Sequence, residues 1–368
     1  MIVTQAPIST VTAMSTRAQR LRMPVPWGLE RNYQHVVVAE LTTSDGGTGC
    51  GFTWTVDAGA EAILAMLDAD CRRVVEGGPT TPSLTWERLR WRLREVGGGI
   101  ACLAMAAVDI GLWDYAARRA GMSLADLIGR RRDRVGVYAS GVNRHLPIGE
   151  LTEQVSRWVA AGHGRVKIKV GLPDLDEDLE RVAAVRRIIG PKRLLMVDAN
   201  QLWDLPAARR AARAMAAFDI FWLEEPLPAD DTRGYARLRA GIDFPVAAGE
   251  SLFTEAQFLD LLSAGGCDIL QPNVCRVGGI TPFLRIAELA RSFSIPVMPH
   301  LLPDISGQLA LCLPLDSLVE DIDTGSFAAL GALAEPGPAV VAGGSMHTEP
   351  RLGHGLKFAA EPSGQTAR

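Results

Sequence analysis

The chain has 368 residues, more than one small hydrophobic core requires, and this length predicts two domains or one large barrel with an addition. Hydrophobic residues make up 48% and charged residues 22%, the balance of an ordinary soluble globular protein. The net charge of −4 provides no basic field for nucleic acid. The N-terminus lacks the basic and apolar regions of a signal peptide, and no apolar run reaches the roughly 18 residues of a membrane helix. We therefore expect neither nucleic acid nor a membrane as a partner.

The cysteines are scattered and form no Cys-x-x-Cys pair. They are Cys50, Cys71, Cys102, Cys267, Cys275 and Cys312. In a chain of this length, such spacing indicates reduced core thiols rather than a metal site or a disulfide framework. A cytoplasmic location is the corresponding expectation.

The first third of the chain predicts a mixed α+β unit. Two strands joined by a Gly-rich turn and then three helices are expected, in the order 34–43, 50–55, 58–76, 83–94 and 99–120. The last helix is apolar nearly all round, which is typical of a buried helix. The charged stretch 129–134 follows, and we place the domain boundary there, with residues 1–133 as the first domain.

Eight short apolar runs follow, and the first seven each precede a stretch that can form a helix. The runs are 135–141, 165–171, 194–200, 220–226, 244–250, 267–273, 295–300 and 317–323. This alternation predicts a parallel sheet, and eight strands with seven helical segments predict an α/β fold, a TIM-like (β/α)₇β barrel over residues 134–325. Residues 326–368 are rich in Gly and Pro and are expected to return to the first domain.

Three carboxylates end three consecutive predicted strands. Asp198, Glu224 and Glu250 are separated by two intervals of 26 residues, each one barrel unit. Because the C-terminal strand ends of a barrel surround one mouth, the three side chains should converge there. Converging carboxylates repel one another unless a cation lies among them, and oxygen ligands favour Mg²⁺, with Mn²⁺ possible. Glu225 should point to the other face of its strand, while Asn200 shares the parity of Asp198 and is a candidate substrate contact.

Basic residues end neighbouring strands of the same predicted mouth. Lys167 and Lys169 are two residues apart and face the same way, and a nearby divalent cation is expected to depress their pKa so that one can act as a base. His300 ends the seventh run and should lie across the mouth. A base, a metal and a second acid/base group predict abstraction of the α-proton of a carboxylate through a metal-stabilised enediolate. Reprotonation then gives racemisation, whereas loss of a β-hydroxyl gives dehydration.

An ordered set of motifs covers nearly the whole chain. They are VDIGLWDYAARRAGMSLADLIG (108–129), KIKVG (167–171), VDANQ (197–201), WLEEP (222–226), GES (249–251), QPNVCRVGGIT (271–281), PHLLPDIS (299–306) and LVE (318–320). This set resembles the enolase superfamily and, within it, the mandelate racemase group. The resemblance implies an α+β capping domain over the barrel, Mg²⁺, a small-molecule carboxylate substrate and self-association into a homo-oligomer.

The resemblance also implies roles for individual residues. Asp198, Glu224 and Glu250 would hold Mg²⁺. Lys169 would be the acid/base on one face, with Lys167 as its electrostatic neighbour and a contact to the substrate carboxylate. His300 would serve the other face, and Glu320, if protonated, would donate a hydrogen bond to the substrate carboxylate. Two loops of the capping domain, around 22–33 and 51–55, would close over the mouth, with Trp27, Tyr33 and Trp54 as candidate substrate contacts.

One residue departs from the mandelate racemase pattern. The sixth strand of that pattern ends in an aspartate that pairs with the histidine, and here the position is Asn273. An aspartate stabilises the charged form of a histidine, whereas an amide gives little such stabilisation and can donate or accept. Our hypothesis is that His300 is mostly neutral and a weaker base than in the family.

This departure disfavours a symmetric racemase with two bases, and it is the one motif feature that favours a non-catalytic protein. The leading interpretation is dehydration of a sugar acid or related hydroxy acid, with Lys169 as the base. The alternative is a racemase or epimerase of an α-substituted carboxylate, and relatives that lactonise or epimerise place a lysine on the sixth strand, which this chain lacks. A second alternative is a non-catalytic descendant that binds a metal and an acid ligand.

Overall fold

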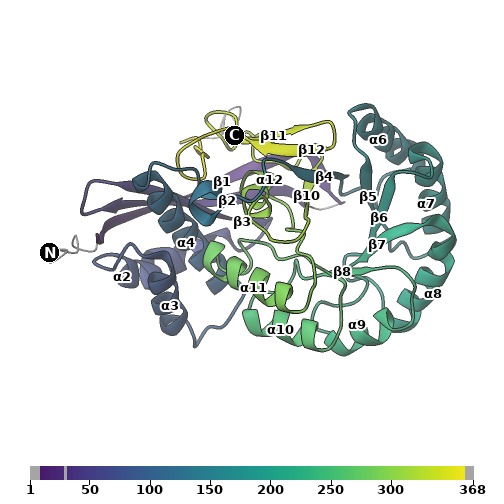
Figure 1. Ribbon diagram of the computed structural model, residues 1–368, viewed down its shortest axis with the longest axis horizontal. Coiled ribbons are helices and arrows are strands. Elements are labelled where there is room, and N and C mark those ends of the chain that lie inside the picture. Colours follow the sequence, from purple (N-terminus) through teal and green to yellow (C-terminus); the bar gives the residue numbers. More distant parts are fainter. Residues whose placement is uncertain (1–8, 29–30, 361–368) are drawn as a thin grey trace.

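The computed structural model describes residues 9–28 and 31–360. The N-terminal part is a three-stranded antiparallel sheet, in the order β1 (Val11–Trp27), β2 (Arg31–Thr43) and β3 (Thr48–Val56). Helices cover it, namely α1 (Ala60–Met66), a π-helical turn (Leu67–Cys71), α2 (Arg72–Val75), α3 (Pro82–Arg92), α4 (Ile100–Arg119) and α5 (Leu124–Ile128). This sheet and its helices form one lobe of the molecule and the barrel forms the other (Figure 1).

Helix α4 lies directly on β3 because the strand carries glycines where the helix crosses it. A Cβ atom on Gly51 would lie 1.8 Å from the carbonyl oxygen of Ala107. Helix α4 is also long and apolar enough to cross a membrane, contrary to our expectation of no such segment. However, 78% of its apolar stretch is buried inside the molecule, as in the core helix of a globular protein.

The sheet of the barrel begins with six parallel strands in chain order. They are β4 (Val135–Ser140), β5 (Arg165–Lys169), β6 (Leu194–Asp198), β7 (Ile220–Glu224), β8 (Val246–Ala248) and β9 (Ile269–Leu270). The strand β10 (Leu318–Ile322) pairs in parallel with β4 and so returns the sheet to its start. Figure 1 shows the strands on the inside of a ring of helices.

The helices of the barrel alternate with these strands. They are α6 (Ile148–Ala160), α7 (Leu175–Ile189), α8 (Leu205–Met215) with a 3₁₀ turn (Ala216–Phe218), α9 (Thr232–Arg239), α10 (Glu255–Ser263), α11 (Ile280–Ser292) and α12 (Pro303–Ala310). The structure therefore has a strand inside seven of the eight predicted runs. The exception is 295–300, where the backbone ladder is reduced to a single bridge between Leu270 and Val297.

The end of the chain has more structure than the sequence indicated. A hairpin of β11 (Ala339–Ala342) and β12 (Ser345–Thr348) pairs with β4, so this part belongs to the barrel sheet. The chain then reaches the N-terminal lobe, where His354 N donates to Asp114 Oδ1 at 2.9 Å. Residues before the hairpin already reach this lobe, since Phe327 meets Phe52 of β3 edge to face at 5.2 Å between ring centroids. The segment after residue 325 therefore contacts the first domain on both sides of the hairpin.

The first strand was also missed. β1 pairs with β2 along most of its length, yet its sequence contains many polar and charged residues and shows no regular alternation. The predicted loops 22–33 and 51–55 are largely strand, because β1 reaches Trp27, β2 begins at Arg31 and 51–55 lies inside β3. Residues 29–30 lie outside the described residues.

Candidate active site

Three carboxylates meet at the C-terminal ends of β6, β7 and β8. One oxygen each of Asp198, Glu224 and Glu250 lies within 4.8 Å of the others, and all three residues are buried. Burial is the main reason that the pKa of Glu224 is raised well above its usual range. The carboxylates of Asp198, Glu250 and Glu320 add to the rise, although Lys167 opposes it. A buried set of oxygen ligands with this excess of negative charge fits Mg²⁺. We call this set the acidic cluster.

Two polar side chains hold Glu224 in place. Trp222 Nε1 donates to Glu224 Oε2 at 3.0 Å, and Gln271 Nε2 donates to the same oxygen at 2.8 Å. Glu225 turns away with a φ of 38° and accepts from Gln201 Nε2 at 3.0 Å, outside the cluster. Neither Trp222 nor Gln271 was predicted as a site residue. Trp222 is two residues from Glu224 on β7 and so faces the same side, whereas Gln271 follows the short strand β9, where strand parity gives no such signal.

The lysines of β5 face the acidic cluster. Lys169 Nζ contacts Asp198 Oδ2, while Lys167 Nζ lies 2.5 Å from Glu224 Oε1 and 2.9 Å from Glu320 Oε1. Burial alone would lower the pKa of Lys169, but the carboxylate of Asp198 holds it above its usual value. Carboxylates set the pKa of this lysine here, whereas the predicted depression depends on a divalent cation among those carboxylates and stays a prediction.

Glu320 also differs from the expectation. Although burial opposes the change, the ion pair with Lys167 lowers the pKa of Glu320 to about 2. The residue is therefore ionised rather than protonated in this arrangement. Leu301 N donates to Glu320 Oε2 at 3.3 Å, so the backbone after His300 is attached to the same carboxylate.

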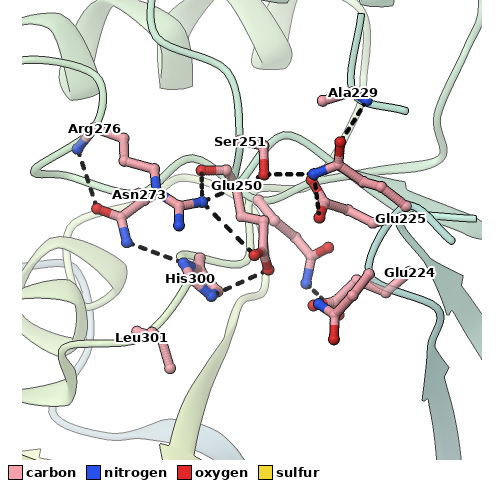
Figure 2. Close-up of polar contacts among 12 residues, drawn as sticks. Glu224, Glu225, Ala229, Glu250, Ser251, Asn273, Arg276, His300 and Leu301 are labelled. Carbon is pink, nitrogen blue, oxygen red and sulfur yellow. Dashed lines mark hydrogen bonds and ion pairs between the residues drawn. The ribbon is translucent and has the colours of Figure 1, made fainter. Parts of the chain in front are cut away.

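His300 contacts Glu250, the member of the cluster on the β8 side of the site (Figure 2). Its Nε2 lies 3.0 Å from Glu250 Oε2, and its Nδ1 lies 2.9 Å from Asn273 Nδ2. Burial lowers the pKa of His300 to about 4, although Glu250 opposes the change. The low pKa agrees with the hypothesis that this histidine is mostly neutral.

Arg276 is a further residue that the sequence analysis did not single out. Its Nη1 donates to the carbonyl oxygen of Glu250 at 2.8 Å and lies 3.7 Å from Glu250 Oε1. It therefore fixes the backbone at the end of β8. It follows Asn273 by three residues in a loop, and no spacing rule pointed to it.

The candidate substrate contacts differ in how close they lie to the acidic cluster and to His300. Trp27 and Trp54 meet edge to face at 6.1 Å between ring centroids and line a small pocket together with Leu301, the neighbour of His300. Tyr33 instead packs under the guanidinium of Arg20, 3.7 Å from its ring centroid, and does not line that pocket. Asn200 approaches the cluster only through its backbone N, which donates to Asp198 Oδ1 at 2.9 Å, while its side chain is exposed.

Comparison with known families identifies this arrangement. Residues 150–362 match the family described as enolase C-terminal domain-like, and residues 10–129 match the N-terminal domain of mandelate racemase and muconate lactonizing enzyme. The chain belongs to the enolase superfamily. Enzymes of this superfamily use Mg²⁺ with a lysine or histidine base.

Two enzymes of the superfamily are similar in sequence to this chain over most of its length. The 3,6-anhydro-α-L-galactonate cycloisomerase of Streptomyces coelicolor is 36% identical over 95% of this chain and 98% of its own length. The L-talarate/galactarate dehydratase of Salmonella typhimurium is 37% identical over 78% of this chain and 73% of its own.

Solved superfamily structures agree with the fold. A racemase from Streptomyces coelicolor with bound magnesium superposes with a TM-score of 0.90 at 34% identity, covering 95% of this chain and 97% of its own. L-Talarate dehydratase from a Polaromonas species, complexed with Mg and L-glucarate, superposes with a TM-score of 0.86 at 34% identity, covering 96% of both chains. The fold is therefore the TIM-like barrel with a capping domain.

Proposed function

We propose that the protein is a Mg²⁺-dependent lyase in which Lys169 removes the α-proton of a sugar acid and a β-oxygen leaves. The observation that carries this proposal is the position of Lys169, whose Nζ contacts Asp198 at the edge of the acidic cluster. Named relatives are sugar-acid dehydratases and cycloisomerases, which supports a sugar acid as the substrate class.

The residues of the site have three proposed roles, namely metal binding, proton abstraction and positioning of the substrate. Asp198, Glu224 and Glu250 would hold Mg²⁺, which when bound supplies positive charge to stabilise the substrate carboxylate as its α-carbon loses a proton. Asp198 would then share its negative charge with the ion, so Lys169 would lose part of its ion pair and its pKa would fall towards the value a base needs. Lys167 and Glu320 would position the substrate carboxylate.

The reaction releases one water from each substrate molecule. The α-carbon–hydrogen bond breaks and its proton goes to Lys169, and the electron pair forms the carbon–carbon double bond as the β-carbon–oxygen bond breaks. The departing oxygen would lie on the side of His300, which donates a hydrogen bond to it and keeps its own hydrogen. The hydroxide takes up a proton from solvent to become water, while Lys169 gives its proton to solvent. The enol product then takes up a proton on carbon and becomes a 2-keto acid. In a 3,6-anhydro acid the same bond changes open the ring without loss of water.

The alternative is racemisation, and the position of His300 favours it as the second candidate. His300 contacts Glu250 on the side of the cluster away from the lysine contact with Asp198. In this case the second group would return a proton to the opposite face of the α-carbon.

The test is a screen of sugar acids with the Mg²⁺-loaded protein in D₂O. It should include talarate, galactarate and 3,6-anhydrogalactonate. A 2-keto product is expected, and Lys169→Met should lower its rate by about 10² to 10⁴, the usual contribution of a general base. Lys192→Met, a change of an exposed lysine, serves as the matched control and should keep the wild-type rate.

The outcomes separate the candidates. Deuterium at the α-carbon with inverted configuration and no 2-keto product would establish the racemase. No exchange with any acid, with Mg²⁺ still bound, would establish a binding protein. Equal activity of wild type and Lys169→Met would remove the lysine from the mechanism.

We also propose the boundaries 1–133, 134–325 and 326–368 for the capping domain, the barrel and the returning segment, and a cytoplasmic homo-oligomer. The free state of all six cysteines supports a reducing compartment. The resemblance to the superfamily supports self-association, which light scattering of the purified protein tests directly.

A further inference from the structure

We propose that Asn273 fixes His300 with its ring hydrogen on Nε2, so that this face of the site offers a hydrogen-bond donor and only Lys169 can accept a proton from the substrate. The inference rests on the proposed function, which it deepens by naming the direction of proton transfer. It follows from the contacts at the two ring nitrogens, which Figure 2 shows.

The orientation of the Asn273 amide is set by the backbone that follows it. Asn273 Oδ1 accepts from Cys275 N at 3.0 Å and from Arg276 N at 3.1 Å. Rotating the amide by 180° would place its NH₂ group against two backbone donors and lose both hydrogen bonds. Because Asn273 is completely buried, water cannot replace them. The amide nitrogen therefore faces His300.

The hydrogen on His300 follows from that orientation. Asn273 Nδ2 lies 2.9 Å from His300 Nδ1 and can only donate, so Nδ1 must accept and cannot carry a hydrogen. The remaining ring hydrogen is then on Nε2. The surroundings of Nε2 agree, since its neighbours are the carboxylates of Glu250 at 3.0 Å and Glu320 at 3.9 Å.

The assignment does not depend on a bound cation. Mg²⁺ at the acidic cluster changes what Nε2 faces, because Glu250 would be one of its ligands. It leaves the Nδ1 side intact, where an amide and two backbone N–H groups are the partners. Asn273 is thus a positioning residue that acts through His300.

The consequence is that a proton can be removed from the substrate on one face of the site only. A ring nitrogen that already carries a hydrogen cannot remove a proton from carbon. It can, however, donate a hydrogen bond to an oxygen that leaves from the β-carbon. An aspartate at this position would accept from Nδ1 and free Nε2 to act as a base. The amide therefore favours elimination over racemisation at the level of a single atom.

The direct test is ¹⁵N NMR of the Mg²⁺-loaded protein with labelled histidine. His300 is assigned among the six histidines by the signal that disappears in His300→Asn. The wild type is expected to carry hydrogen on Nε2 only, and Asn273→Asp should move hydrogen to Nδ1. Asn143→Asp is the matched control, because it places the same charge at another completely buried amide of the barrel without touching His300. A wild-type His300 with its hydrogen on Nδ1 would overturn the inference.

A second measurement follows proton exchange from both faces. Galactarate is a meso acid with one α-carbon of each configuration, whereas each enantiomer of talarate has the same configuration at both α-carbons, so the wild type should exchange an α-proton in galactarate and in only one enantiomer of talarate. Asn273→Asp should raise exchange of the other enantiomer at least ten-fold. Comparable exchange of both enantiomers by the wild type would contradict the inference. If neither acid exchanges, the NMR result still decides the position of the hydrogen, so the inference and the proposed function can fail separately.

Discussion

Glu250 is the member of the acidic cluster with the weakest cationic pairing. Asp198 and Glu224 each contact a lysine of β5, whereas the nearest basic groups to Glu250 are Arg276 at 3.7 Å and the imidazole of His300 at 3.0 Å. Without a metal its negative charge therefore adds repulsion to the folded protein. The same charge is what makes the site attract a cation.

Glu250→Gln is expected to stabilise the metal-free protein by about 1 kcal/mol, because the amide keeps an oxygen towards His300 and removes a buried negative charge next to two other carboxyl groups. It should also lose most of the stabilisation by Mg²⁺. In the wild type that stabilisation is about 2.7 kcal/mol at a concentration 100-fold above Kd. Urea unfolding with EDTA and with Mg²⁺ measures both effects.

Glu288→Gln is the control for this experiment. Glu288 lies on the surface and pairs with Arg291 at 2.8 Å. Its loss should change stability by less than about 1 kcal/mol and leave the Mg²⁺ effect intact. A metal-free Glu250→Gln protein that is less stable than the wild type would show that repulsion in the cluster is not important.

Single residues also show how far the sequence could predict the site. Asp198, Glu224 and Glu250 were brought together correctly because each ends a strand one barrel unit from the next. Lys167 and Glu320 were both expected at the substrate carboxylate, but their direct ion pair, between strands 153 residues apart in the chain, was not predicted. The expected protonation of Glu320 failed for the same reason, since this ion pair sets its pKa.

Helix α11 is capped by a residue of another helix rather than by its own sequence. Its N-cap is Gly279, and Asp109 of α4 accepts from Thr281 N at 2.8 Å and from Thr281 Oγ1 at 2.6 Å. Trp113 Nε1 donates to the same hydroxyl at 3.0 Å. The N-terminal lobe thus supplies hydrogen-bond acceptors that the barrel helix lacks.

This cap predicts a pH dependence of stability. Burial raises the pKa of Asp109 to about 7, although the hydrogen bonds from Thr281 oppose the rise. Because the folded pKa lies above the ordinary 3.8, the folded protein holds this proton more tightly. The contribution of Asp109 is therefore fully present below about pH 4 and is lost as the pH rises through about 7.

Asp109→Asn keeps a capping oxygen and removes the titration. Between pH 5 and 8 the wild type should lose about 2 to 3 kcal/mol of unfolding free energy relative to this variant. Urea unfolding at several pH values measures the difference. Asp260→Asn, a change of an exposed acid, should give a curve parallel to the wild type. A constant difference between the wild type and Asp109→Asn would contradict the assignment.

Elements also differed in how well the sequence predicted them. Buried parallel strands such as β6 and β7 are short apolar runs between helices, and these were found within a few residues. β1 was missed because both its faces carry polar residues, and its pairing with β2, rather than its own pattern, makes it a strand. The hairpin of β11 and β12 was missed because each strand has four residues and its partner, β4, is far away in sequence.

The C-terminal segment forms a second connection between the barrel and the N-terminal lobe. His354 is buried against the N-terminal lobe, where its Nε2 lies 2.6 Å from the carbonyl oxygen of Cys50 and its Nδ1 accepts from Leu356 N at 3.0 Å. Asp114 of α4 accepts from the backbone N of both Cys50 and His354. The segment after the hairpin is thus part of the core of the first lobe.

His354→Ala should cost about 1 to 3 kcal/mol, because the carbonyl oxygen of Cys50 loses its buried donor. The loss should appear as faster hydrogen exchange of the amides of β3, measured by NMR or mass spectrometry. Lys357→Ala lies in the same segment but removes only an exposed pair with Glu335, and it should have almost no effect. Unchanged exchange in β3 of His354→Ala would mean that this segment does not hold the lobe together.

The position of His354 has a consequence for how a ribosome produces this protein. The first lobe is synthesised before the barrel, yet part of its core arrives only with residues near 354, about 300 residues after β3. Phe52 and Trp54 of the sheet also share one apolar core with Phe327 and Phe358, so this face of the sheet cannot be fully covered until the last residues of that core have been synthesised. The domain that is made first is therefore completed last.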